Sequence, residues 1–327
     1  MSSLLEKAWY SGAKWPLLLK PLECLFCLIA ERKKQQALVV QWIAPVPVII
    51  VGNINVGGTG KSPLVIHLIK LLRELGYRPG VVSRGYGSQA PSYPYRVMPD
   101  SPPQCSGDEP LMIVQRTHVP FVIDPDRPRA CRALLEAFDC NLIISDDGLQ
   151  HYALGRDIEI AVIDAERGVG NGHCLPVGPL REKETRLHTV DYVVVNGSGA
   201  FQCPNSTPMQ LLHDQWLSVQ DNQPIALEVL KKTQVHAVAG IGRPTRFYDT
   251  LRASGLEVIE HSFPDHHNYT EEDVSFQDAL PVIMTEKDAV KCRQLSLPSN
   301  YYYLTVKVEL ATSFKASLQQ RLNHIDK

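Results

Sequence analysis

The chain has 327 residues, of which 44% are hydrophobic and 21% are charged. This length is enough for about two domains with cores of their own, and the composition is typical of a globular protein rather than a disordered one. The 33 Lys and Arg residues are balanced by 35 Asp and Glu, giving a formal charge of −2, so the overall charge does not indicate a nucleic-acid partner.

Residues 1–34 combine large apolar side chains with a basic cluster. Trp9, Trp15 and the apolar stretch over residues 17–30 precede the basic run at residues 32–34. The stretch is interrupted by charged residues and is too short to span a bilayer, which takes ~20 apolar residues. Two interpretations stay open from the residues alone: a segment in the interface of an anionic membrane, or a helix packed on the globular core.

A phosphate-binding loop is predicted between residues 46 and 63. The apolar, β-branched residues 46–51 are typical of a buried parallel strand, and residues 61–75 have helical periodicity. The glycines between them allow the backbone to approach a polyphosphate, whose charge backbone N–H groups and the helix N-terminus would stabilise. The candidate nucleotide-binding residues are Asn55, Val56, Gly57, Gly58, Thr59, Gly60, Lys61, Ser62 and Pro63.

Two side chains at the end of this loop have the chemistry that a bound triphosphate requires. The Lys61 ammonium would stabilise phosphate charge, and the Ser62 hydroxyl would bind a magnesium ion. The loop is a variant of the strict motif, which has glycine where this chain has Asn55.

Further strands are predicted to end in polar residues at the edge where α/β sheets bind ligands. Arg84 and Tyr86 follow a strand over residues 80–83, and Asp146 with Asp147 follows one over residues 141–145. An acidic turn after a strand is common, but with a phosphate-binding loop upstream we interpret the two aspartates as a second magnesium-binding element. The remaining strands of this half are predicted over residues 119–123 and 158–163.

The glycine- and proline-rich residues 168–179 mark a predicted domain boundary. We expect an α/β protein with a P-loop NTPase-type core, a mostly parallel sheet and a second, smaller α/β domain. The expected parts are residues 1–34, 35–178 and 179–327, with the last strand or helix able to pack back on the first domain. Strands of the second half are predicted over residues 191–195, 225–230, 235–239, 256–260, 281–284 and 301–308, with a helix over residues 244–254.

Along the chain, in this order, lie the motifs GNINVGGTGKSP, SRGYG, GDEP, DPDR, DDGLQH, LPVGPLRE, GIGRPTRF, FPDHHNY and TEKDAVK. In this ordered combination they resemble the tetraacyldisaccharide 4′-kinase family of Gram-negative bacteria across most of the chain. Two departures from the family pattern are Ser62, where threonine is usual, and Arg243, where asparagine is usual.

The resemblance implies transfer of the γ-phosphoryl group of ATP, with Mg²⁺, to the 4′-hydroxyl of tetraacyldisaccharide 1-phosphate, giving lipid IV A. It places the enzyme at the cytoplasmic face of the inner membrane, with the lipid disaccharide and an anionic membrane surface as partners and no protein partner. An acyl-chained substrate lies in a bilayer, so the resemblance favours the interfacial interpretation of residues 1–34.

The resemblance also implies roles for single residues. Asp108 would work with His266 to activate the acceptor hydroxyl, while Lys61 and Asp147 complete the catalytic set. Ser62, Asp146 and Asp147 would hold the magnesium ion. Further candidates for substrate contacts are Arg84, Tyr86, Glu109, Arg127, Gln150, His151 and Glu182.

Asp108 and His266 lie in different predicted domains, so the site is expected between them. We therefore predict that the two side chains are beyond hydrogen-bond reach in a structure without substrates. Two other function classes remain open: a soluble P-loop small-molecule kinase or NTPase whose first thirty residues belong to the core, and a nucleotide-regulated, membrane-associated binding protein in which Asp108 is dispensable.

Overall fold

A computed structural model describes residues 4–230 and 234–325. Twelve strands form one continuous sheet in the order β10-β9-β11-β12-β8-β7-β6-β1-β5-β2-β4-β3. All neighbours pair in parallel except β12 with β8 and β3 with β4. The predicted α/β class with a mostly parallel sheet is confirmed.

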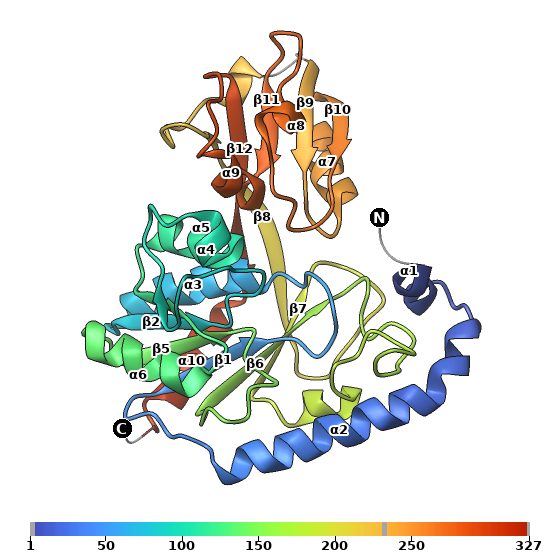
Figure 1. Cartoon of the computed structure of the whole chain (residues 1–327), viewed down its shortest axis with the longest axis vertical. Coiled ribbons are helices and arrows are strands. Elements are labelled where there is room, and N and C mark those ends of the chain that lie inside the picture. The colour runs from blue at the N-terminus through green and yellow to red at the C-terminus, as the bar shows by residue number, and fades with distance from the viewer. Residues whose placement is uncertain (1–3, 231–233, 326–327) are drawn as a thin grey trace.

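The first lobe contains β1 to β7 and forms the lower half of Figure 1. Its central strands are buried along their whole length, which explains their continuous apolar sequences. The strands are β1 (Val48–Gly52), β2 (Pro79–Ser83), β3 (Tyr95–Arg96), β4 (Phe121–Ile123), β5 (Leu142–Asp146), β6 (Ile158–Asp164) and β7 (Tyr192–Asn196).

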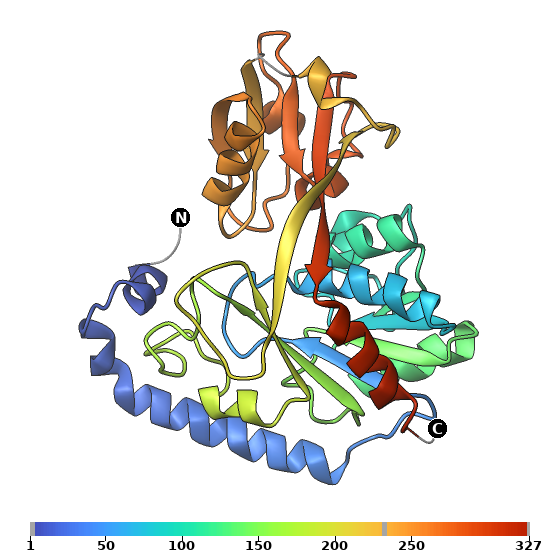
Figure 2. The same ribbon diagram turned by 180° about the vertical axis from the view of Figure 1, so that it is seen from behind.

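The longer helices of the first lobe bury apolar side chains in its core. In α3 the residues Leu64, Leu68 and Leu72 are fully buried, and they share a core with Phe314 and Leu318 of the last helix. The C-terminal helix therefore packs on the first lobe, as Figure 2 shows from behind. The helices are α3 (Lys61–Glu74), α4 (Pro103–Ser106), α5 (Asp108–Thr117), α6 (Arg127–Ala137), η2 (Glu184–His188) and α10 (Thr312–Leu322).

The second lobe lies above the first in Figure 1 and has a core of its own. Its parallel strands are β9 (Gln234–Ala239), β10 (Glu257–Ser262) and β11 (Val282–Thr285). Its helices are η3 (Leu227–Val229), α7 (Pro244–Ala253), α8 (Glu271–Val274) and α9 (Glu286–Cys292).

Two long antiparallel strands, β8 (Thr207–Ser218) and β12 (Tyr301–Leu310), connect the lobes. Strand β8 was not predicted, because most of its side chains are only partly buried and its sequence lacks an apolar alternation. The predicted strand over residues 225–230 is wrong, since η3 occupies its centre. Strand β7 pairs with β6, so the first lobe continues past residue 179 to Asn196.

The N-terminal segment forms α1 (Leu4–Tyr10), η1 (Trp15–Leu19) and α2 (Lys20–Val39). In Figure 1, α2 runs along the lower edge of the first lobe and α1 lies at its right-hand side. Trp9 is buried and its Nε1 donates a 3.1 Å hydrogen bond to the carbonyl of Pro176, so the expectation of an interfacial Trp9 is wrong. Helix α2 has no buried residue. Its exposed large apolar side chains are Leu22, Leu25, Leu28, Ile29, Leu38 and Val39, and Trp15, Leu17 and Leu18 precede them.

None of the helices within residues 4–230 and 234–325 has both the length and the apolar character needed to cross a bilayer.

Candidate active site

The glycine-rich loop, residues 53–60, joins β1 to α3. Gly57 and Gly60 have φ angles of 113° and 94°, a backbone region that residues with a side chain rarely adopt. A Cβ atom on Gly60 would lie 2.6 Å from Nδ2 of Asn196, at the end of β7. The same Nδ2 donates a 3.0 Å hydrogen bond to the carbonyl of Thr59. Glycine therefore lets the loop pack directly on the neighbouring strand.

One side of this loop is anchored and the other is open. Asn55 is buried, and its Nδ2 donates a 3.0 Å hydrogen bond to the carbonyl of Gly168. The backbone N–H of Val56 donates to the carbonyl of Pro179 at 2.9 Å. Because the Asn55 side chain makes one of these contacts, it holds the anchored side of the loop in place. Val56 and Gly58 are exposed, so the open side of the loop is accessible to a phosphate group.

The two adjacent aspartates at the end of β5, Asp146 and Asp147, have different environments. Asp146 is 4% exposed and its Oδ1 has no hydrogen-bond partner. Burial, with Glu109 and Asp147 nearby, raises the pKa of Asp146 to about 7. Burial alone would also raise the pKa of Asp147, but Lys61 at 3.4 Å and Arg181 at 3.1 Å hold it at about 2. Asp147 is therefore anionic at neutral pH.

The unpartnered Oδ1 of Asp146 fits the expected magnesium site. Ser62 lies at the start of α3, and its hydroxyl donates a 3.1 Å hydrogen bond to Oε2 of Glu109. No group of three or more His, Cys, Asp and Glu side chains in the described part of the chain is arranged to hold a metal alone. Magnesium commonly binds one or two carboxylates and takes its other ligands from water and substrate phosphates, so this donor set is suitable.

Asp108 and His266 are in contact, although they belong to different lobes. Asp108 begins α5, and His266 lies in the loop after β10. The Nδ1 atom of His266 is 3.0 Å from Oδ2 and 3.2 Å from Oδ1 of Asp108. The prediction that the pair is separated without substrates is therefore wrong. A cavity of 90 Å³ lies beside the pair and is also lined by Tyr86, Asn268 and Lys291.

Ionisation of the pair follows from this contact. Burial would raise the pKa of Asp108, but the hydrogen bond from His266 and the charge of Lys287 lower it to about 2. The hydrogen bond to Asp108 raises the pKa of His266. Asp108 is therefore a carboxylate at neutral pH and can accept a proton.

Three side chains that the sequence prediction missed complete this region. Arg181 pairs with Asp147, and Asn196 holds the glycine-rich loop. The Nζ atom of Lys287 lies 3.0 Å from Oε1 of Glu109 and 3.7 Å from Oδ2 of Asp108. Arg181 and Lys287 belong to motifs noted in the sequence, LPVGPLRE and TEKDAVK, but nothing local shows what they contact.

Arg127 is placed behind the aspartates. It is 1% exposed, and its guanidinium donates hydrogen bonds to the carbonyl of Asp124 at 2.8 Å and the carbonyl of Asp146 at 3.3 Å. Burial lowers the pKa of Arg127 to about 10, so the side chain remains charged at neutral pH. In this arrangement Arg127 fixes the backbone that carries Asp146.

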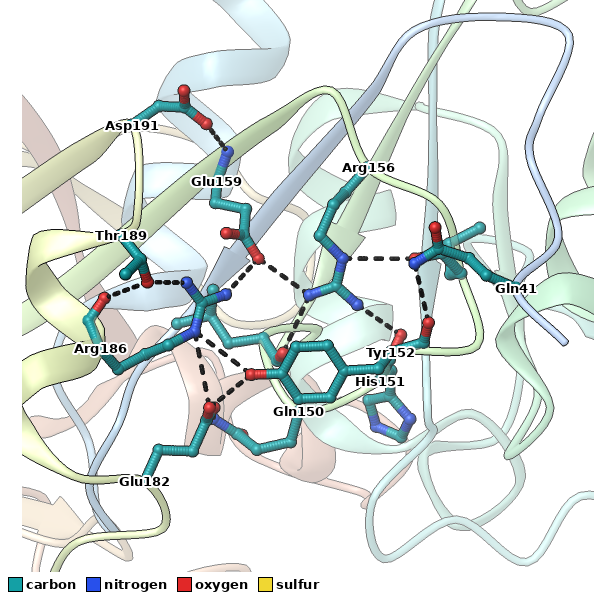
Figure 3. A network of polar contacts seen from close by, with 12 residues as sticks. Gln41, Gln150, His151, Tyr152, Arg156, Glu159, Glu182, Arg186, Thr189 and Asp191 are labelled. Atoms are coloured by element: carbon teal, nitrogen blue, oxygen red, sulfur yellow. Dashed lines mark hydrogen bonds and ion pairs between the residues drawn. The ribbon is translucent and has the colours of Figure 1, made fainter. Parts of the chain in front are cut away.

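Gln150 and Glu182 belong to the network of polar contacts that Figure 3 shows. The Nε2 atom of Gln150 donates to Oε1 of Glu182 at 2.6 Å and to the carbonyl of Asn53 at 3.0 Å. Tyr152 donates to the second oxygen of Glu182, and Arg186 lies next to both. The network joins the DDGLQH and LPVGPLRE segments and holds both against the end of β1.

The remaining candidates differ in exposure. Burial, reinforced by the charge of Arg127, lowers the pKa of His151 to about 3, so its imidazole is neutral. Arg84 is exposed, and Tyr86 is 73% exposed with its ring centroid 5.7 Å from that of His266. Arg84 and Tyr86 are therefore accessible to an incoming acceptor.

A larger cavity of 480 Å³ lies between the lobes. It is lined by Ser62 and Glu109 of the first lobe and by Arg246, Phe247 and Lys287 of the second. A ligand that starts at the glycine-rich loop can therefore be contacted by both lobes.

Comparison with known proteins supports the same assignment. The family model described as tetraacyldisaccharide-1-P 4′-kinase matches residues 15–323. The chain is 47% identical to the tetraacyldisaccharide 4′-kinase of Nitrosococcus oceani, over 100% of this chain and 96% of the relative. It is 48% identical to the tetraacyldisaccharide 4′-kinase of Azotobacter vinelandii, over 96% of this chain and 95% of that relative. A crystal structure of LpxK from Aquifex aeolicus in complex with ATP is 27% identical, with a TM-score of 0.79, covering 95% of this chain and 99% of that one.

With the motifs in order and the similarity extending over nearly the whole chain, this protein belongs to the tetraacyldisaccharide 4′-kinase family.

Proposed function

We propose that this protein transfers the γ-phosphoryl group of ATP to the 4′-hydroxyl of tetraacyldisaccharide 1-phosphate, a step of lipid A biosynthesis that gives lipid IV A and ADP. The observation that carries the proposal is the contact between Asp108 and His266 across the lobes, beside a cavity and close to the glycine-rich loop. A bond forms between the 4′-oxygen and the γ-phosphorus, and the bond to the β,γ-bridging oxygen breaks.

Asp108 is the proton acceptor in this proposal. Its carboxylate takes the proton of the 4′-hydroxyl as the new bond to phosphorus forms, a contribution of ~10²–10⁴ in rate. His266 binds the carboxylate through Nδ1 and keeps it oriented. Because the pKa of Asp108 is about 2, the carboxylate is available at neutral pH.

The phosphate end of the reaction belongs to the first lobe. Lys61 and the exposed backbone of residues 56–58 would stabilise the β- and γ-phosphates of ATP. Ser62, Asp146 and Asp147 would hold a magnesium ion, which neutralises charge on the transferring group when it is bound. Arg181 keeps Asp147 in place at 3.1 Å.

We also propose that the protein binds the surface of an anionic membrane peripherally, at the cytoplasmic face of the inner membrane of Gram-negative bacteria. The support is the row of exposed apolar side chains on α2, next to the basic residues 32–34. A substrate with four acyl chains has to be reached in a bilayer. The membrane-facing surface of α2 would therefore bring the active site to it.

Product identification tests the proposal. Purified protein is incubated with labelled ATP and tetraacyldisaccharide 1-phosphate, and the lipid product is analysed for a phosphate at the 4′-position. We expect this product from the wild type and a loss of it in Asp108→Ala, with the exposed Asp139→Ala as matched control. Phosphorylation of small soluble sugars instead of the lipid would support the soluble-kinase class, and ATP binding without any product would support the binding-protein class.

A further inference from the structure

Lys287 occupies a position between the lobes that the proposed reaction has not yet explained. It lies in the first turn of α9, and its side chain is 15% exposed. Its Nζ atom is 3.0 Å from Glu109, 3.2 Å from Asp265 and 3.7 Å from Asp108. One ammonium group of the second lobe therefore lies among three carboxylates, two of which belong to the first lobe.

These contacts form a continuous path between the two halves of the active site. The Ser62 hydroxyl, at the start of α3, donates to one oxygen of Glu109 at 3.1 Å. Lys287 donates to the other oxygen of Glu109 and lies beside Asp108, which binds His266 at 3.0 Å. Asp265 accepts from Lys287 and also from the backbone N–H of His266 at 3.1 Å. The path thus runs from the glycine-rich loop to the acceptor-activating pair.

The charge of Lys287 is required by its surroundings. Burial would lower the pKa of its ammonium, but Glu109, Asp108 and Asp265 raise it well above its usual value. Without a cation the three carboxylates would repel one another in a partly buried site, and an ATP molecule would add further negative charge. The positive charge of Lys287 therefore reduces repulsion in the site both with and without bound nucleotide.

We propose that Lys287 is a positioning residue for phosphoryl transfer, which holds the Asp108 carboxylate at a fixed distance from Ser62 and joins the acceptor-activating pair to the phosphate-binding loop. This inference rests on the proposed kinase function. Lys287 acts through Asp108 and Glu109, and it is not itself the proton acceptor.

The test measures kcat, the KM for both substrates and the Kd for ATP in the variants Lys287→Met, Lys287→Gln and Lys287→Arg. We expect the two uncharged variants to lose about a hundredfold in kcat, as for removal of one charge-stabilising group, while the Kd for ATP changes less than threefold. Lys287→Arg keeps the charge and should retain at least a tenth of the wild-type kcat.

The pH profile of kcat/KM separates positioning from simple stabilisation of the fold. The groups facing Asp108 are His266 after β10, Lys287 and Lys291 on α9, Asp265 behind Lys287, and Glu109 on its own helix. Removing one cation from this set makes the Asp108 carboxylate easier to protonate. The acid limb should therefore move to higher pH in Lys287→Met and stay in place in Lys287→Arg.

Arg293→Met is the matched control, because Arg293 also lies just after α9 and contacts Gln115 of the first lobe, but lines neither cavity. All rates are expressed per ATP-binding molecule, so a partly unfolded variant is still informative. If the uncharged variants keep kcat within threefold of the wild type, or lose no more than Arg293→Met, the inference is overturned. A different result would overturn the proposed kinase function, namely a wild-type rate in Asp108→Ala.

Discussion

Adjacent residues at the end of β5 are held in different states of ionisation. Asp147 pairs with Lys61 and Arg181 and has a pKa of about 2, whereas Asp146 is buried with an unpartnered oxygen and a pKa of about 7. A cation near Asp146 would compensate the charge that the protein leaves without a partner. The unpartnered oxygen of Asp146 therefore supports the magnesium site that we propose.

We predict that Asp146→Asn and Asp147→Asn raise the magnesium concentration needed for half-maximal activity by about ten- to a hundredfold. Amide oxygens carry no charge and bind a hard cation more weakly than carboxylates do. The measurement is kinase activity against magnesium at fixed ATP, with Asp139→Asn as control. A titration curve that is unchanged in both variants would remove Asp146 and Asp147 from the metal site.

At the glycine-rich loop, Lys61→Ala and Ser62→Ala should lower kcat by about 10²–10³-fold, because each removes a group that stabilises charge in the transition state. Lys70→Ala, on the exposed part of the same helix, is the control and should keep the wild-type rate. Steady-state kinetics with saturating lipid acceptor measures the effect. Near-normal turnover in both loop variants would contradict a phosphate-binding role for this loop.

His151 predicts a pH dependence of stability. Its pKa in the folded protein is about 3, below the ordinary value of 6.5, so the unfolded chain binds the proton more readily between these values. The free energy of unfolding should therefore be highest above pH 6.5 and fall with decreasing pH, by at most tenfold in the equilibrium constant per pH unit. Denaturation of wild type and His151→Phe at pH 7.5 and 5 measures this contribution. An equally steep loss in the variant would assign the acid sensitivity to other groups.

The sequence predicts those site residues whose role is indicated by their neighbours in the chain. Lys61 and Ser62 end a glycine-rich turn, and the aspartates 146 and 147 follow an apolar strand. It missed Arg181, Asn196 and Lys287, because their partners lie 34, 137 and 178 residues away and become neighbours only through the fold.

At the scale of elements, α2 differs from the other long helices. Helix α3 buries eight of its residues in the core, whereas α2 buries none and touches the first lobe mainly through Phe26, Cys27 and Glu23. Glu23 accepts a 2.7 Å hydrogen bond from the backbone of Cys174, which fixes the helix on the lobe. The exposed leucines of α2 therefore lie on a helix whose position on the first lobe is fixed.

We predict that Leu22→Glu with Leu25→Glu weakens binding to anionic vesicles by about tenfold or more, since two leucines lose the apolar environment of the bilayer. High salt should weaken binding of the wild type, because the contact that we propose between the basic residues 32–34 and anionic lipid is electrostatic. The control is Gln319→Glu with Gln320→Glu, which adds the same charge on exposed α10. Sedimentation with vesicles measures binding, and unchanged binding of the leucine variant would place the membrane contact elsewhere.

The strands that connect the lobes are harder to predict from sequence than the buried central strands. Strands such as β1 and β5 are buried on both faces, so their apolar runs identify them. Strand β8 is half exposed and pairs with β12 over most of its length, and this pairing determines its conformation more than its own residues do. Residues 225–230 have the composition of a strand, but they lead into the second lobe through η3.

At the scale of the whole molecule, contacts across the lobes keep the site assembled. Arg116 of α5 pairs with Glu286 of α9 at 2.8 Å, and Lys287 follows directly with its three carboxylates. Arg243 and Arg246 of the second lobe both pair with Asp164 at the end of β6. These ion pairs hold the two lobes together, so that Asp108 and His266 are in contact without substrates. The sequence did not predict this contact, because it carries no information on the partners of these charges.

We propose that Asp108 and His266 act as one unit in transfer to the lipid acceptor. The measurement is single-turnover transfer from labelled ATP in wild type, Asp108→Ala, His266→Ala and the double variant. Each single variant should lose about 10²–10⁴-fold, and the double variant should be little slower than the slower single one, because residues that act together give non-additive losses. Losses that multiply in the double variant, or a single variant with wild-type transfer, would contradict the account.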